Sequence, residues 1–255
     1  MEPIKTNITI LILGLLILLS GFLSSCKEEE EPEPEIKLGL ISQYSLSIPE
    51  PSGLSFFRSQ NEFLTVSDET NKIYAISDKG EVLGDFSFSG DDLEGIAYDP
   101  IQKNIFIIEE ENHYIFRLDT NGVELNRFPV DLYYEEINHG PEGISFNPEN
   151  NHLFIVTEKK PGKLLEMNLN GEIINNYNLS FADDYSALFF DPIDQKLWIL
   201  SDESKTLTRC DLTGKALNKY NTGITKGEGL VVDPQNNMVY IVSDQENMMY
   251  VLSIP

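Results

Sequence analysis

The chain has 255 residues, of which 42 are Asp or Glu and 18 are Lys or Arg, so its formal net charge is -24 at pH 7. A polyanion of this kind is excluded from non-specific binding to nucleic acid, because phosphates would repel it. The length allows a full hydrophobic core, in one large domain or two small ones.

The N-terminus resembles a bacterial lipoprotein signal. Lys5 precedes a mostly apolar run over residues 8–23, which at about 16 residues is shorter than the roughly 20 needed to span a bilayer. Residues 23–26, "LSSC", are similar to a lipobox, which implies that residues 1–25 are removed and that Cys26 is acylated. An unmodified cysteine in a leader is the alternative. Lipidation would leave Cys210 without a disulfide partner, so stability must come from packing.

Residues 26–36 are predicted to form an acidic, flexible tether. The stretch "KEEEEPEPE" at 27–35 contains no apolar residue, as expected of a solvated, extended segment. It is either a plain spacer or, by its resemblance to the surface-export signal of Bacteroidetes lipoproteins, an export signal. We therefore expect an outer-membrane lipoprotein, attached through Cys26 and exposed to the periplasm or the cell surface.

Residues 37–255 contain five repeats. Segments 61–77, 103–119, 151–168, 195–211 and 237–253 each show an apolar run, an acidic break and a second alternating run, which indicates two strands joined by a turn. A third strand precedes each segment, at 52–57, 94–99, 142–147, 186–191 and 228–233. A fourth strand, opened by Gly, follows the first four segments and completes a four-stranded antiparallel sheet.

The acidic break recurs at 68, 110, 158, 202 and 244, with spacings of 42, 48, 44 and 42 residues. A period near 44 residues with four strands per unit is typical of a β-propeller blade. The last repeat ends after three strands, and the segment at 38–48 reads as an unassigned strand. We therefore predict an all-β, five-bladed β-propeller, closed by the N-terminal strand in the last blade, where it covers an exposed edge. We expect a monomer.

The first strand of each blade lines the channel of a propeller, so its first residues converge on the axis. Ser52, Glu94, Glu142, Ser186 and Glu228 occupy this position, each followed by Gly or Ala. Three close carboxylates repel one another unless protons, water or a cation compensate. Oxygen ligands suit Ca2+ or Mg2+. We predict a metal site at Glu94, Glu142 and Glu228; the alternative is a water-filled channel.

A second acidic column follows the second strand of each blade. A rim around the mouth is predicted from Asp68, Glu110, Glu158, Lys159, Asp202 and Asp244, together with Ser52 and Ser186. The structural interpretation of the acidic column is that each side chain accepts hydrogen bonds from the adjacent turn. Lys159 stands where other blades have Glu, and it could pair with a carboxylate or bind an anionic ligand.

Catalytic residues are weakly indicated. His139, three residues before Glu142, is a candidate together with Glu142 itself, although a lone loop histidine is more often simply exposed. The sequence has no nucleophile elbow, P-loop, dinucleotide fingerprint or zinc-ligand spacing. Tyr185, Trp198 and the other aromatic residues fall at strand positions that favour the core.

Segments 138–168, 184–207 and 226–247, with the Glu-Gly, Glu-Lys-x-Pro and Ser-Asp-Glu-Ser motifs in order, resemble the SdiA-regulated family, which includes the YjiK-like proteins. The resemblance spans 38–255 and implies a five-bladed propeller, without implying a role in quorum sensing. The chain is more distantly similar to calcium-dependent propeller hydrolases of the paraoxonase and gluconolactonase type. Only Glu94, Glu142 and Glu228 carry over from those enzymes, whose Asn, Asp and His residues have no counterpart that can be placed.

The sequence thus favours a membrane-anchored propeller that binds a divalent cation and an unknown small-molecule or protein ligand at the channel mouth. One alternative is a calcium-dependent hydrolase of lactones or phosphoesters, in which the metal acts as Lewis acid. Another is a structural scaffold without metal.

Overall fold

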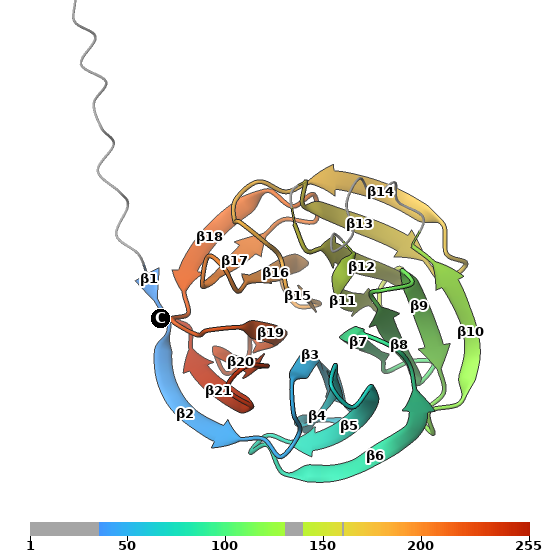
Figure 1. Cartoon of the computed structure of the whole chain (residues 1–255). Helices are drawn as coiled ribbons and strands as arrows, with labels where there is room; N and C mark the ends of the chain where they lie inside the picture. Colours follow the sequence, from blue (N-terminus) through green and yellow to red (C-terminus); the bar gives the residue numbers. More distant parts are fainter. Residues whose placement is uncertain (1–35, 131–139, 160) are drawn as a thin grey trace, which may run out of the picture. The chain divides into compact units, whose positions relative to one another are not determined.

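The computed structural model describes residues 36–130, 140–159 and 161–255. All regular elements of these residues are β-strands, arranged in five sheets around a central axis (Figure 1). The sheets and their cores lie within one compact unit, Glu35–Pro255. Among the described residues, no helix has the length and apolar character needed to cross a membrane.

Each sheet contains one blade of a propeller, whose four strands pair antiparallel from the axis outward. Blade 1 contains β3 (Pro51–Phe57), β4 (Ser59–Ser67), β5 (Lys72–Ser77) and β6 (Val82–Ser89). Blade 2 contains β7 (Leu93–Asp99), β8 (Asn104–Glu109), β9 (Tyr114–Leu118) and β10 (Glu124–Pro129). Blade 3 contains β11 (Pro141–Asn147), β12 (His152–Thr157), β13 (Lys163–Asn168) and β14 (Ile173–Asn178). Blade 4 contains β15 (Ala187–Asp191), β16 (Lys196–Ser201), β17 (Thr206–Cys210) and β18 (Ala216–Asn221).

Blade 5 confirms the predicted closure of the ring. Its first three strands are β19 (Gly227–Asp233), β20 (Met238–Ser243) and β21 (Met248–Ser253), and its outer strand is β2 (Gly39–Ser45) from the N-terminal side. β2 pairs antiparallel with β21, with Gln43 opposite Tyr250. A further short strand, β1 (Ile36–Lys37), adds parallel to β18 of blade 4. The N-terminal strands β2 and β1 therefore cover the edges of β21 and β18, which would otherwise be exposed.

The inner strands pack side by side around the channel, and the small residues of the Glu-Gly column make this possible. β3, β7, β11, β15 and β19 each contact the next inner strand, and β19 contacts β3. A Cβ atom added to Gly95 would lie 2.2 Å from the carbonyl oxygen of Glu142 on the neighbouring strand. Such a distance forbids any side chain, so Gly is required where the backbones approach most closely.

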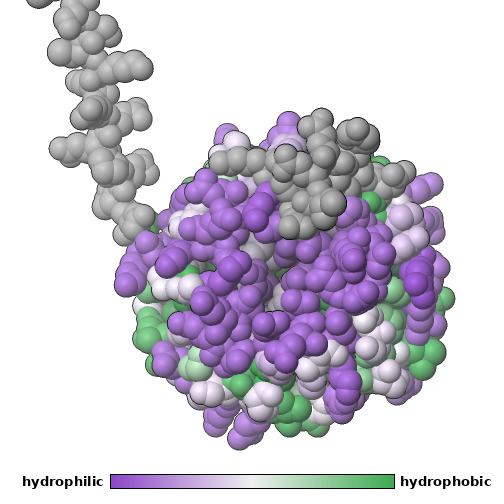
Figure 2. Space-filling view, viewed as in Figure 1, coloured by the Kyte–Doolittle hydropathy of each residue, from purple (hydrophilic) through white to green (hydrophobic). Residues whose placement is uncertain are grey.

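The hydrophobic core lies between blades. Five clusters of buried apolar side chains occur in the described residues, and each joins two adjacent blades. Between blades 2 and 3, for example, Phe106 stacks on Phe146 with ring centroids 5.9 Å apart. Each blade therefore buries its faces against its neighbours, and the ring stabilises itself only as a whole. Viewed as in Figure 1, the face around the centre of the ring is largely hydrophilic (Figure 2).

Candidate functional site

The channel opens, at the N-terminal ends of the inner strands, into a polar cavity of about 140 Å³. We call this cavity the acidic mouth. Its lining residues come from all five blades and their entering loops: Glu50, Ser52, Asp68, Glu94, Glu142, Glu158, Asp184, Ser186, Asp202, Lys226, Glu228 and Asp244. Nine of these twelve described residues carry a carboxyl group, and one is cationic. Glu110 and Lys159, which were also predicted for the rim, are not among these lining residues.

The three inner glutamates are in different states. The Ser52 hydroxyl donates a hydrogen bond of 2.6 Å to Glu94 Oε2. Glu228 lies 3.5 Å from the Lys226 ammonium. Glu142 is 8% exposed and has no hydrogen-bond or ion-pair partner among the described residues, although it lines the cavity. It is therefore the carboxyl group that the protein itself leaves uncompensated.

Burial and mutual repulsion shift the pKa values of these groups upward. Desolvation, followed by repulsion from Glu94 and Glu110, raises the pKa of Glu142 well above its ordinary value of 4.5. Desolvation also raises the pKa of Glu94, although its bond from Ser52 opposes the shift. The pKa of Glu228 rises to about 8, because burial and Asp202 outweigh Lys226. Without a bound cation, these carboxyls hold protons at pH values where free glutamate does not.

The rim residues directly follow the second strand of each blade, and their backbones are tied to the inner strand's entrance. The amide of Asp68 donates to the Glu50 carbonyl over 3.2 Å, and the amide of Glu110 donates to the Asp92 carbonyl over 2.9 Å. Blades 3 and 5 repeat this bond from Glu158 to Gly140 and from Asp244 to Lys226. Four blades therefore position the rim with a backbone bond, whereas in blade 4 the amide of Asp202 donates to the Asp184 carboxylate over 3.1 Å.

In three blades the side chain of the residue before the rim carboxylate holds the turn, and in blade 5 the Asp244 carboxylate also accepts the amide of Gln245. The hydroxyl oxygens of Ser67, Ser201 and Ser243 accept hydrogen bonds from backbone amides three residues further on, at 3.1, 3.1 and 3.3 Å. The structural role considered for the acidic column thus belongs largely to the serine before it. Asp68, Asp202 and Asp244 keep their side chains on the cavity.

Three lining residues of the acidic mouth, Glu50, Asp184 and Lys226, were not predicted from the sequence, nor was Asp92, which lies beside Asp68 and Glu94. All occupy one column, two residues before the inner Ser or Glu, where blade 3 has Gly140. A signal therefore existed, because four of the five positions in this column are charged. Three of them, Glu50, Asp92 and Lys226, have positive φ angles of 42°, 55° and 48°, which are uncommon for such residues.

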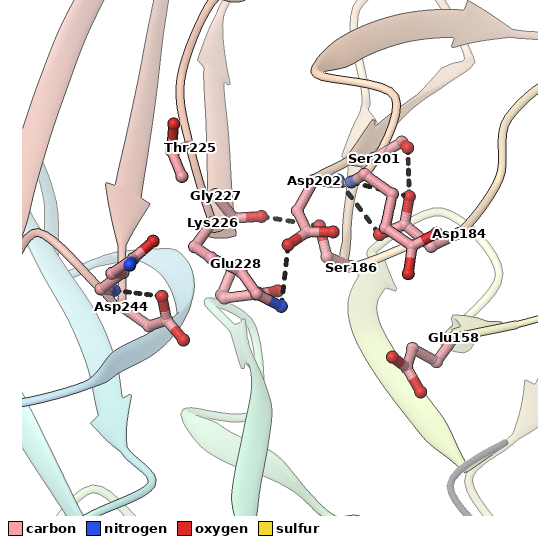
Figure 3. Close-up of polar contacts among 12 residues, drawn as sticks. Glu158, Asp184, Ser186, Ser201, Asp202, Thr225, Lys226, Gly227, Glu228 and Asp244 are labelled. Carbon is pink, nitrogen blue, oxygen red and sulfur yellow. Dashed lines mark hydrogen bonds and ion pairs between the residues drawn. The ribbon is translucent and has the colours of Figure 1, made fainter.

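One half of the acidic mouth is neutralised from within (Figure 3). Lys226 Nζ lies 2.8 Å from Asp202 Oδ2 as well as 3.5 Å from Glu228. Asp184 accepts hydrogen bonds from the Ser201 hydroxyl and from the amides of Asp202 and Glu203. Burial and its hydrogen bond with Asp202 raise the pKa of Asp184 to about 7. This half is thus a structural network of protons, hydrogen bonds and one ammonium group.

On the other side of the cavity, the described residues form two groups of carboxylates, and none of these residues supplies a buried cation to either group. Oxygen atoms of Asp68, Asp92 and Glu94 lie within 4.8 Å of one another, and so do those of Glu110, Glu142 and Glu158. Lys159 Nζ is 3.0 Å from Glu158 Oε1, but its side chain is 41% exposed. Desolvation and Asp92 raise the pKa of Glu110 to about 7.

Gly140 makes room for the second group. A Cβ atom at this position would lie 2.4 Å from Glu110 Cγ and 2.8 Å from its Oε1 atom. Glu110 therefore packs against Gly140, and a side chain at position 140 would displace it.

Two predicted residues lie outside the described residues: His139, the weak catalytic candidate, and Cys26, the predicted lipidation site. Lys159 is placed on the rim, where it pairs with Glu158 and lies 3.9 Å from Glu203. Lys159 is therefore engaged by carboxylates of the protein.

The fold and the mouth define a five-bladed propeller with a carboxylate-lined channel. The profile of the SdiA-regulated family matches residues 43–253, so the chain belongs to this family. Among solved structures, Myxococcus xanthus glutaminyl cyclase shares 12% identity, with a TM-score of 0.67 over 86% of this chain and 97% of that one. A gluconolactonase from Xanthomonas campestris shares 12% identity, with a TM-score of 0.56 over 83% and 88%. Virginiamycin B lyase from Staphylococcus aureus shares 17% identity, with a TM-score of 0.51 over 83% and 69%. At these identities the likeness extends to the fold alone.

Proposed function

We propose that the acidic mouth binds a divalent cation, with Ca2+ as the best fit, and that the propeller presents this cation to a ligand. The observation that carries the proposal is Glu142, a buried carboxyl aimed into the cavity without a partner among the described residues. A cation would supply the missing partner and relieve the repulsion that raises the pKa values of Glu94, Glu110 and Glu142.

The donor set supports a hard cation. Glu110, Glu142 and Glu158 offer carboxylate oxygens within 4.8 Å of one another, with Glu94 on the next strand. The described residues that line the cavity include no His or Cys, whereas transition metals favour nitrogen and sulfur ligands. Ca2+ accepts six to eight oxygen ligands in flexible geometry and completes its shell with water. The Glu228 side is the less suitable half, because Lys226 already occupies it.

Thermal unfolding of residues 35–255 in EDTA, and then in CaCl2 or MgCl2 at matched ionic strength, tests the proposal. At 100 times its Kd, a bound cation stabilises the native state by about 2.7 kcal/mol, which raises Tm by about 5–10 °C for a domain of this size. The variant Glu142→Gln should lose most of this response. The matched control Glu81→Gln, at an exposed outer turn, should keep it.

A response of wild type that Glu142→Gln retains would mean that divalent ions act on the general negative charge. No response of wild type would remove the cation site altogether.

Metal-dependent hydrolysis is a second candidate function. It is favoured by the approach of Glu110 to Glu142 and Glu158, with oxygen atoms within 4.8 Å of one another, which would place a carboxylate base beside a Lewis-acidic cation. The gluconolactonase neighbour makes lactones the first substrates to try. Hydrolysis of δ-gluconolactone or p-nitrophenyl acetate should require Ca2+ and should be lost in Glu110→Gln. If the protein binds the metal but hydrolyses neither compound, the hydrolase function is rejected and only the binding function is supported.

We also propose that Cys26 anchors the propeller to the outer membrane, on the strength of the lipobox-like residues 23–26. Incorporation of labelled palmitate that disappears in Cys26→Ala, with release of the protein from the membrane fraction, is the expected result. Labelling that persists in the variant would contradict it.

A further inference from the structure

The opposite end of the channel contains a second, larger cavity of about 660 Å³. We call it the aromatic mouth. It is lined by the C-terminal halves of all five inner strands and by residues of the connection that follows each of them. It shares no lining residue with the acidic mouth. Its volume lies within the range of about 300–1,000 Å³ that is usual for small-molecule sites.

The floor of the aromatic mouth is apolar and contains several rings. Each inner strand except β19 contributes at least one aromatic side chain: Phe56, Phe57, Tyr98, Phe146, Phe189 and Phe190. Phe56 and Phe189 come from opposite sides of the ring and meet edge to face, with centroids 6.1 Å apart. Phe56, Tyr98 and Phe189 are only partly buried, so their ring surfaces are available to a flat apolar molecule.

The aspartate side chains at this end hold the turns, although Asp191 Oδ2 is buried without a hydrogen-bond partner among the described residues. In blades 2 to 5 an Asp or Asn ends or nearly ends the inner strand and is followed by Pro. Asp99 and Asp191 each accept two backbone amides of the following turn. Asp233 accepts the amides of Gln235 and Asn236 and the Asn236 side chain. These carboxylates therefore belong to the turns.

Blade 1 departs from this pattern and places a cation on the rim. Arg58 alone separates β3 from β4, has a positive φ of 34° and is exposed. Its guanidinium carbon lies 4.4 Å from the centroid of the Phe57 ring. A strained non-glycine backbone of this kind is often found at functional sites.

Blade 2 adds a second cation. Lys103 ends the turn after β7 with φ 59°, at the position where blades 3 to 5 have Asn151, Gln195 and Asn237. Its exposed side chain has no hydrogen bond or ion pair among the described residues. A protein with a net charge of -24 thus has two adjacent blades that contribute positive charge to one apolar cavity.

We propose that the aromatic mouth binds a small molecule with a flat apolar body and one anionic group, such as an aromatic carboxylate. The rings of Phe56, Tyr98 and Phe189 hold the apolar body, and Arg58 and Lys103 bind the anion. Because the rest of the protein repels anions, this end of the channel is the place where such a molecule meets complementary charge.

Titration calorimetry of residues 35–255 with 2-naphthoate and with its neutral analogue 2-naphthamide tests the proposal. Wild type should bind naphthoate with 1:1 stoichiometry and about tenfold or more tightly than naphthamide, since a charge-assisted contact adds to the same apolar burial. The variant Arg58→Asn/Lys103→Asn should abolish this preference and leave naphthamide binding unchanged. Asn is compatible with both positive φ angles, and blades 3 and 5 already use it.

Two controls locate the effect. Lys79→Asn/Lys215→Asn removes the same charge from exposed outer turns and should keep the preference, as should Glu142→Gln in the acidic mouth. If the double Asn variant does not fold, as shown by the absence of a cooperative unfolding transition, wild type alone tests the proposal. Its preference for naphthoate over naphthamide should then disappear at high salt.

The proposal is overturned if wild type shows no saturable naphthoate binding or binds both compounds equally. It is also overturned if the preference survives in a folded Arg58→Asn/Lys103→Asn variant, or is lost equally in Lys79→Asn/Lys215→Asn.

Discussion

The acidic mouth and the aromatic mouth are the two ends of the same five inner strands, yet they meet different physical requirements. At the acidic mouth each inner strand has Ser or Glu next to its first residue, and buried carboxyls lie close together with raised pKa values. At the aromatic mouth the strands end in rings that stack between blades and in side chains that hold turns. The aromatic end therefore contributes much of the ring's stability, whereas the acidic end reduces stability unless protons or cations are bound.

The largest expected effect lies at the aromatic end. Phe146→Ala removes a ring that is 6% exposed and stacks on Phe106 between blades 2 and 3. We expect a loss of about 3 kcal/mol in the free energy of unfolding, because a cavity replaces the ring. Urea denaturation at pH 5 and at pH 8 should give the same loss, as no titrating group is involved. A loss below about 1 kcal/mol would show that this end is not a stabilising contact between blades.

The acidic end should instead show a marked pH dependence. Glu110 and Glu228 have folded-state pKa values of about 7 and about 8, against 4.5 ordinarily. Between these values the folded state binds more protons than the unfolded state, so stability falls as pH rises from about 5 to about 8. In EDTA, Tm should fall by several degrees over this range, at about 2–4 °C for each kcal/mol. Glu142→Gln should flatten the curve, and a Tm that rises with pH would contradict the account.

The smallest effect concerns the neutralised half of the acidic mouth. Lys226 is half exposed and pairs with Asp202 and Glu228, so Lys226→Gln should cost no more than about 1 kcal/mol. The same change frees two carboxylates and should tighten Ca2+ binding by roughly twofold to fivefold, as measured by calorimetry. Weaker Ca2+ binding in this variant would contradict the account, because removal of a positive charge near the site reduces the repulsion of the cation.

Much of this architecture could be predicted from the sequence, because a feature that recurs at the same position in several repeats can be recognised by aligning them. The regular acidic break, the Glu-Gly column and the short last repeat gave the number of blades and their closure by β2. The glycines were predictable for the same reason, since inner strands crowd in any propeller and Gly95 has no room for a Cβ atom.

The state of each carboxyl was not predictable in this way. Lys226 belongs to blade 5 but pairs with Asp202 of blade 4, and no spacing within one repeat reveals a contact between repeats. The aromatic mouth was hidden for a related reason. Phe56, Tyr98 and Phe189 have the strand spacing of core residues, and only the packing of five strands leaves their rings partly uncovered.

Anomalous diffraction from crystals of residues 35–255 grown with Tb3+ in place of Ca2+ tests the central claim most directly. The account predicts a strong anomalous peak in the acidic mouth, in contact with Glu142 and with Glu110 or Glu158, and absent from Glu142→Gln crystals. Peaks confined to exposed turn carboxylates such as Asp119, or no peak in the mouth, would contradict it.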